Sequence, residues 1–355
     1  MKIPELQIGN LAPNLPIVQG GMGVRVSLAS LASAVSNEGG IGTISSIGLG
    51  DVSGSAERCE ATARDALIAE VRKARSMTEG HIAINFMGVL SNVNELIKAV
   101  VDEGVRLIVF GAGLPMRLPS IVQDPDVCLV PIVSCARAAD LILRTWDRRY
   151  SMIADGFILE GPLAGGHLGF SPEQLETPDA FSLEKILPEV LETVKPYEDK
   201  YGRKIPIITA GGIYSGKDIA RMLSLGASGV QMGTRFVCTV ECDASPEFKE
   251  AYLEAEKEDI VIIESPVGMP GRAINNNFLK ELDLKGKIKV DCPYRCLTAC
   301  KAKSAKYCIA RALLNSYQGN TDNGLIFCGQ NAYRAKKIVT VRELFKELLS
   351  ELEEA

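Results

Sequence analysis

The stretch IPIITAGGIYSGKDIARMLSLGASGVQMGTRF, from Ile205 to Phe236, decides the fold. It opens with an apolar run, Ile205–Thr209, whose β-branched residues are typical of a strand buried on both faces. The glycines of Gly211-Gly212 then allow a tight turn, and an S-x-x-D pattern marks the start of a helix. A second strand, Gly229–Met232, runs into Gly233-Thr234. The stretch therefore predicts two consecutive parallel strands, each ending in a glycine turn.

Two such turns side by side present a concave group of backbone N–H donors, which suits a phosphate dianion. In an eight-stranded β/α barrel, the phosphate site lies in the loops that follow strands seven and eight. The stretch therefore predicts the phosphate-binding end of a barrel. The alternative is that these glycines serve turn geometry alone.

Six further strand–helix units precede this stretch in strict alternation. Alternation with helices requires crossover connections and hence a parallel sheet, and eight units favour a closed (β/α)8 TIM barrel over an open sheet. The six earlier strands are predicted at Leu15–Val18, Ile41–Ser45, His81–Phe86, Arg106–Phe110, Val127–Val133 and Gly156–Glu160.

The regular alternation stops after about Glu264. We predict a barrel over residues 1–260, a C-terminal segment with a cysteine-rich extension over 261–335, and a terminal helix over 336–355. Pro246–Glu258 is expected to be helical, and Ser265–Asn277 is expected to be a loop.

Bulk composition excludes several classes of function. The net charge of −5 and a pI near 5.4 argue against nucleic acid as a partner. No apolar run reaches the roughly 18 residues of a membrane span, and the N-terminus carries no apolar export signal. We therefore expect a cytoplasmic protein without a membrane partner, whose ten cysteines are reduced. A homodimer is compatible with the sequence.

Six motifs follow one another along the chain: PIVQGGMG at Pro16–Gly23, INF at Ile84–Phe86, AGGH at Ala164–His167, TAGGI at Thr209–Ile213, QMGTRF at Gln231–Phe236 and ECDAS at Glu241–Ser245. Together, in this order, they resemble the nitronate monooxygenase (2-nitropropane dioxygenase) family of FMN-dependent barrels and its relatives, the FMN-dependent enoyl-acyl-carrier-protein reductases. The resemblance covers about residues 1–280 and again 324–332, and it implies that the C-terminal segment over 261–335 contains a lid over the substrate pocket.

The resemblance implies FMN, with its phosphate held by the turns after strands seven and eight. It places one glycine-rich loop along the flavin ring, an asparagine at the polar edge of the ring, and a second glycine loop close to it. The residues implied in cofactor binding are Gly21, Met22, Gly23, Asn85, Ala164, Gly165, Gly166, Gly211, Gly212, Gln231, Gly233 and Thr234.

His167 is the candidate catalytic residue. It follows two glycines after strand six, where a barrel places catalytic groups, and it matches the family's histidine. An imidazole suits proton transfer at a carbon beside an electron-withdrawing group, and flavin chemistry leaves such a proton to be moved. The alternative is a loop histidine that only stabilises the turn through hydrogen bonds.

The cysteines of the extension form the most unusual pattern. The spacing of Cys292, Cys296 and Cys300 would place them on one face of a helix, with Cys308 nearby. Thiolates so arranged could ligate an iron–sulfur cluster or zinc, but the spacing matches neither the zinc nor the ferredoxin patterns. We therefore favour packed thiols over a metal site.

Three functions follow, all with a small-molecule ligand. The first is an FMN-dependent oxidoreductase that oxidises alkyl nitronates with O2. The second is an NAD(P)H-dependent flavin reductase of an activated C=C bond, such as an enoyl thioester. The third, from another class, is a non-catalytic protein that binds flavin or a phosphate-bearing ligand.

Overall fold

A closed barrel of parallel strands forms the body of the protein. The computed structural model describes residues 3–51, 56–290, 296–298, 300 and 304–355. Eight strands of this part of the chain pair in the order β1-β9-β8-β6-β5-β4-β3-β2, and Val18 of β1 bridges Ile41 beside β2, which closes the circle. The strands are β1 (Ile17–Gln19), β2 (Gly42–Ser45), β3 (Ile82–Met87), β4 (Leu107–Gly111), β5 (Cys128–Val133), β6 (Phe157–Glu160), β8 (Ile207–Ala210) and β9 (Gly229–Met232). The predicted TIM barrel is confirmed.

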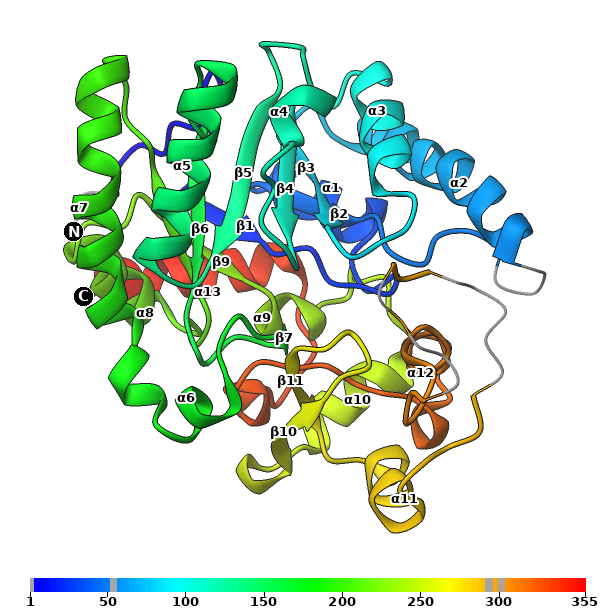
Figure 1. Cartoon of the computed structure of the whole chain (residues 1–355). Helices are drawn as coiled ribbons and strands as arrows, with labels where there is room; N and C mark the ends of the chain where they lie inside the picture. The colour runs from blue at the N-terminus through cyan, green and yellow to red at the C-terminus, as the bar shows by residue number, and fades with distance from the viewer. Residues whose placement is uncertain (1–2, 52–55, 291–295, 299, 301–303) are drawn as a thin grey trace.

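Helices surround the strands (Figure 1). The terminal helix α13 (Val341–Glu353) packs against both α1 and α8, so the helix at the end of the chain fills the gap in the ring beside β1. Across the described ranges, no helix combines the length and apolarity needed to cross a bilayer. The other helices around the barrel are α1 (Ala29–Asn37), α2 (Ala56–Met77), α3 (Val93–Asp102), α4 (Leu118–Ile121), α5 (Ala136–Tyr150), α7 (Leu183–Tyr201) and α8 (Gly216–Ser224).

Alternating side chains of the strands fill the barrel interior. Ala83 and Ile158 belong to the apolar cluster inside the barrel, whereas their immediate neighbours in the strand pack outward against the helices. Because side chains alternate along a strand, the next inward positions are Asn85, Glu160 and Gln231. These three polar residues lie in the C-terminal halves of their strands and line the cavity described below.

A second group of elements covers this end of the barrel (Figure 1, lower part). Its centre is a three-stranded antiparallel sheet in which β11 pairs with both β10 and β7. The elements are β7 (Gly166–His167), α6 (Pro172–Glu176), α9 (Thr234–Val237), α10 (Pro246–Glu254), β10 (Ile260–Glu264), β11 (Pro270–Ile274), α11 (Asn277–Lys285) and α12 (Ile309–Tyr317).

Two sequence-based predictions for this region are wrong. The segment expected to be a loop, Ser265–Asn277, contains strand β11. Pro270 and Gly271 begin this strand, and both residue types are uncommon inside strands, so the local sequence does not indicate one. The helix expected to end at Glu258 ends at Glu254, after which a short 3-10 turn leads into β10.

The expectation that the cysteines share one helix face is also wrong where it can be tested. Cys296 and Cys300 lie outside any helix, and Cys308 caps the start of α12. Cys292 lies outside the described residues. Within the described ranges, no three potential ligands among His, Cys, Asp and Glu come together as a metal site. Cys296 and Cys308 pack beside the buried side chains of Val24 and Leu314.

Residues of the ECDAS motif, Glu241–Ser245, accept hydrogen bonds at the starts of helices. The Glu241 carboxylate accepts a hydrogen bond from the first N–H of α13 at 2.9 Å. The Asp243 carboxylate accepts from Leu28 and Leu31 N–H, at the start of α1, at 2.8 and 3.2 Å. Ser245 caps α10. Three neighbouring residues thus satisfy the free N–H groups of three helices that are far apart in the sequence.

Replacing Asp243 with alanine is expected to destabilise the fold by roughly 1–2 kcal/mol, because two buried N–H groups lose their acceptor. The midpoint of thermal unfolding should fall, and Asp243→Asn should recover part of the loss through its amide oxygen. Asp179→Ala, at an exposed position, is the control. Equal midpoints for Asp243→Ala and this control would show that the cap contributes little.

Candidate active site

The predicted site residues meet around one cavity of about 410 Å³ at the C-terminal ends of the strands. The volume lies in the range of small-molecule sites. The residues come from five segments of the chain, which the barrel brings to one mouth. All thirteen line the cavity: Gly21, Met22, Gly23, Asn85, Ala164, Gly165, Gly166, His167, Gly211, Gly212, Gln231, Gly233 and Thr234.

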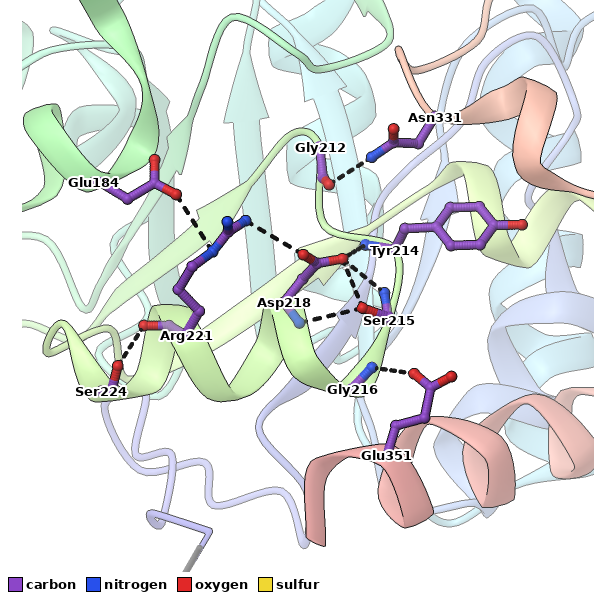
Figure 2. Close-up of polar contacts among 10 residues, drawn as sticks. All are labelled: Glu184, Gly212, Tyr214, Ser215, Gly216, Asp218, Arg221, Ser224, Asn331 and Glu351. Carbon is purple, nitrogen blue, oxygen red and sulfur yellow. Dashed lines mark hydrogen bonds and ion pairs between the residues drawn. The ribbon is translucent and has the colours of Figure 1, made fainter. Parts of the chain in front are cut away.

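The turn after β8 has the backbone conformation that the sequence predicted. Gly211 and Gly212 have φ values of +97° and +82°, in the left-handed region that favours glycine. In the described part of the chain, the N–H groups of Gly212 and Gly233 have no acceptor. The side chain of Asn331 donates to the Gly212 carbonyl at 2.7 Å and holds the turn in place (Figure 2).

The start of α8 is already satisfied by carboxylates of the protein (Figure 2). Asp218 accepts from the N–H groups of Tyr214 and Ser215 at 3.1 and 3.0 Å. Glu351 of α13 accepts from Gly216 N–H at 2.7 Å. An anion would therefore find its donors in the glycine turns and not at the first N–H groups of the helix.

Asn85 carries a polar atom that lacks a partner. Its side chain is 8% exposed, and among the described residues its Oδ1 makes no hydrogen bond. The Nδ2 atom lies 3.5 Å from the Gly21 carbonyl oxygen, at the limit of a hydrogen bond. Because buried polar atoms are normally paired, this amide is suited to a ligand edge that both donates and accepts.

His167 lines the cavity as a half-buried residue of the covering sheet. Its Nε2 is 2.7 Å from Ser265 Oγ, and its ring meets the Phe327 ring edge-on with centroids 4.9 Å apart. Burial lowers the pKa of His167 to about 4. The imidazole is therefore neutral near pH 7, so that it can donate one N–H but is a weak base.

Two charged residues of the site escaped the sequence analysis. Arg272 of β11 is 3% exposed and donates from one Nη to the carbonyls of Pro162 (2.8 Å) and Ala164, so it anchors the loop before His167. Glu160 lines the cavity. Burial raises the pKa of its carboxyl group to about 7, although the positive charge of Arg272 acts to lower it. The alternation of side chains along strand six would have indicated that Glu160 points into the barrel. Arg272 could not be found in this way, because it lies in a segment that was expected to be a loop.

Comparisons with known proteins place the chain in a family. The family model for nitronate monooxygenase matches residues 6–98 and 82–351. The chain is 29% identical over 268 residues to a (3aS,4S,5R,7aS)-5-hydroxy-7a-methyl-1-oxo-octahydro-1H-indene-4-carboxyl-CoA dehydrogenase of Mycobacterium tuberculosis, covering 76% of this chain but only 65% of that protein. It is 25% identical over 319 residues to a probable nitronate monooxygenase of Staphylococcus saprophyticus, with 80% and 82% covered.

Solved structures show the same architecture. FabK from Thermotoga maritima superposes with a TM-score of 0.74 at 26% identity, over 96% of this chain and 94% of that one. Nitroalkane oxidase from Streptomyces ansochromogenes superposes with a TM-score of 0.72 at 22% identity, over 96% of each, which shows a shared fold. With the family model matched over nearly its whole length, the chain belongs to the nitronate monooxygenase family of oxidoreductases, which is related to the enoyl-acyl-carrier-protein reductases.

Proposed function

We propose that this chain is an FMN-dependent oxidoreductase that converts alkyl nitronates and O2 into carbonyl compounds and nitrite. The observation that carries the proposal is the convergence of a glycine-turn anion site, an unpaired Asn85 amide and a neutral His167 on one cavity. Family membership supports it independently.

The residues around the cavity fit FMN. The free N–H groups of Gly212 and Gly233 would hold its phosphate, and the amide of Asn85 would meet the polar edge of its ring. A Cβ atom built on Gly166 meets no atom within 4 Å, so there is open space beside this loop for a flat ring. When bound, FMN would supply the two-electron acceptor that such an oxidation requires.

The chain's own residues would bind and orient the anionic substrate. A neutral imidazole at His167 can donate a hydrogen bond to a nitronate oxygen, while Ser265 fixes the orientation of the ring. The Phe327 ring and Met22 provide apolar walls of the cavity. Apolar walls exclude water and so strengthen the hydrogen bond to the substrate anion.

A second candidate is an NAD(P)H-dependent reductase of an activated C=C bond. Two observations favour it: the superposition on FabK and the similarity to a dehydrogenase of a carboxyl-CoA compound. In this reaction His167 would contact the carbonyl of a thioester in place of a nitronate oxygen.

Anaerobic stopped-flow spectroscopy of the FMN-loaded protein separates the two functions. We expect the flavin absorption to bleach with ethylnitronate and to remain unchanged with NADH or NADPH. Rapid bleaching by a reduced pyridine nucleotide would favour the reductase. Failure of the apoprotein to quench added FMN fluorescence would contradict both.

A further inference from the structure

One of the two ring nitrogens of His167 is hydrogen-bonded to the protein. Its Nε2 lies 2.7 Å from Ser265 Oγ, whereas in the described part of the chain its Nδ1 makes no hydrogen bond. Because His167 lines the cavity, Nδ1 is the nitrogen left for a ligand. Whether Nδ1 donates or accepts a hydrogen bond depends on which of the two nitrogens carries the proton of the neutral ring.

The hydroxyl group of Ser265 has one proton, which needs an acceptor. The hydroxyl oxygen accepts the N–H of Val267 at 3.3 Å, and Ser265 is only 8% exposed. Among the described residues, His167 Nε2 is the acceptor within reach of the hydroxyl proton. A proton on Nε2 would leave this buried O–H without an acceptor, which is unfavourable. Ser265 therefore donates to Nε2, and the imidazole proton resides on Nδ1.

The backbone around Ser265 holds the hydroxyl in this position. Ser265 directly follows β10, in the turn that leads to β11. Its N–H donates to the Met269 carbonyl at 3.3 Å, and its carbonyl accepts from Gly268 N–H at 2.9 Å. Because both backbone groups are engaged, Ser265 Oγ keeps a fixed place relative to β11, the strand that pairs with His167.

An aromatic ring holds the imidazole from a second direction. His167 pairs with Gly271 of β11, and Phe327 bridges Ala273 two positions further along the same strand. The imidazole and phenyl rings therefore lie side by side and meet edge-on, with centroids 4.9 Å apart. A Cβ built on Gly271 would lie 2.9 Å from Phe327 Cε1, so this glycine leaves the space that the phenyl ring occupies. Tyr252 donates to the Phe327 carbonyl at 2.6 Å, which holds the segment that carries the phenyl ring.

We propose that Ser265 is a positioning residue that fixes the proton of His167 on Nδ1, so that the cavity presents an N–H donor and the ligand must supply the acceptor. The proton assignment follows from the contacts alone, whereas its use in turnover rests on the proposed function. A nitronate oxygen is such an acceptor, and a donor that is already oriented stabilises negative charge without reorganisation. Burial lowers the pKa of His167 to about 4, which agrees with a neutral ring that holds one proton.

The proton can be located directly by NMR, because the chain contains two histidines, His81 and His167. The full-length protein, labelled with ¹⁵N in histidine, would be measured at neutral pH with and without FMN. His81→Ala and His167→Ala assign the signals, and protonated and unprotonated ring nitrogens resonate in separate regions. We expect Nδ1 of His167 to carry the proton and Nε2 to be unprotonated. A wild-type spectrum with the proton on Nε2 would overturn the proposal, whatever the activity of the protein.

The same spectra test the part played by Ser265. In Ser265→Ala the donor to Nε2 is gone, so we expect the proton to be shared between the two nitrogens. Ser265→Thr keeps a hydroxyl group and should restore the proton to Nδ1. Ser350→Ala, at an exposed position, is the matched control and should leave the spectrum unchanged. A proton that stays on Nδ1 in Ser265→Ala would contradict the positioning role.

Kinetics test the use of this proton in turnover. We expect Ser265→Ala to lower kcat/KM for ethylnitronate roughly 2- to 10-fold, the size of one neutral hydrogen bond. In a His167→Ala background it should have no further effect, because Ser265 acts through the imidazole. An equal loss in both backgrounds would show that Ser265 acts elsewhere and would reject its positioning role. If the wild-type protein carries the Nδ1 proton but does not oxidise ethylnitronate, the proposed function fails and the proton assignment stands.

Discussion

Replacing His167 with alanine is expected to lower kcat/KM for ethylnitronate about 10²-fold, because a hydrogen bond to a charged group contributes roughly 1.5–3 kcal/mol. FMN affinity should change little, since in the proposed function the imidazole contacts the substrate while it is bonded to Ser265. Steady-state oxygen consumption and a fluorescence titration with FMN measure the two quantities.

The pH dependence tests the protonation state of His167. With its pKa lowered to about 4 by burial, the imidazole stays neutral at every pH well above that value. The factor by which His167→Ala lowers kcat/KM should therefore be the same on the acidic and the alkaline side of neutrality. His81, at the opposite end of β3, provides the matched control, and His81→Ala should retain activity. A loss that grows as the pH falls through neutrality would instead show that a protonated His167 acts.

Replacing Gly165 with alanine is expected to weaken FMN binding roughly 5- to 150-fold, because overpacking at a rigid site costs roughly 1–3 kcal/mol and moves the backbone. An added Cβ would lie 2.5 Å from the carbonyl carbon of Cys328 and 2.6 Å from the nitrogen of Gly329. Both are backbone atoms, so the conflict cannot be relieved by a side-chain rotation. The displaced segment leads directly into Asn331, which holds the turn at Gly212.

Gly202→Ala is the matched control for Gly165→Ala. Gly202 ends α7 with φ at +66°, and a Cβ built there meets nothing within 4 Å. This variant should lose some stability through backbone strain but bind FMN normally. Normal FMN affinity in Gly165→Ala, measured by fluorescence titration, would show that the contact with Cys328 and Gly329 is not needed to shape the cavity.

The barrel could be predicted from sequence because its strands are continuous apolar runs bounded by glycine turns. Ile207–Ala210 is completely buried, and such strands carry a strong local signal. Strand β11 gave no such signal, since a proline, a glycine and an arginine occupy its first three positions. Its strand character comes from pairing with β10 and with His167, more than a hundred residues earlier, which no local pattern encodes.

The residues of the candidate site likewise divide into those with a local sequence signal and those without one. Glycine motifs pointed to residues that line the cavity because a backbone that must turn sharply or lie close to another group restricts residue choice. The pKa values of Glu160 and Arg272 depend on burial and on each other's charge, which exist only after the covering sheet has packed on the barrel mouth. A pKa near neutrality is a property of that assembled environment and cannot be read from residue type.

The position of α13 has a consequence for synthesis in the cell. A ribosome delivers the chain from its N-terminus, yet residues 341–353 pack between α1 and α8, and Phe345 lies against Phe236 with ring centroids 6.1 Å apart. Until this last helix leaves the exit tunnel, the nascent barrel exposes apolar surface on two of its helices. The barrel can therefore complete its packing only after residues 341–353 have emerged from the ribosome.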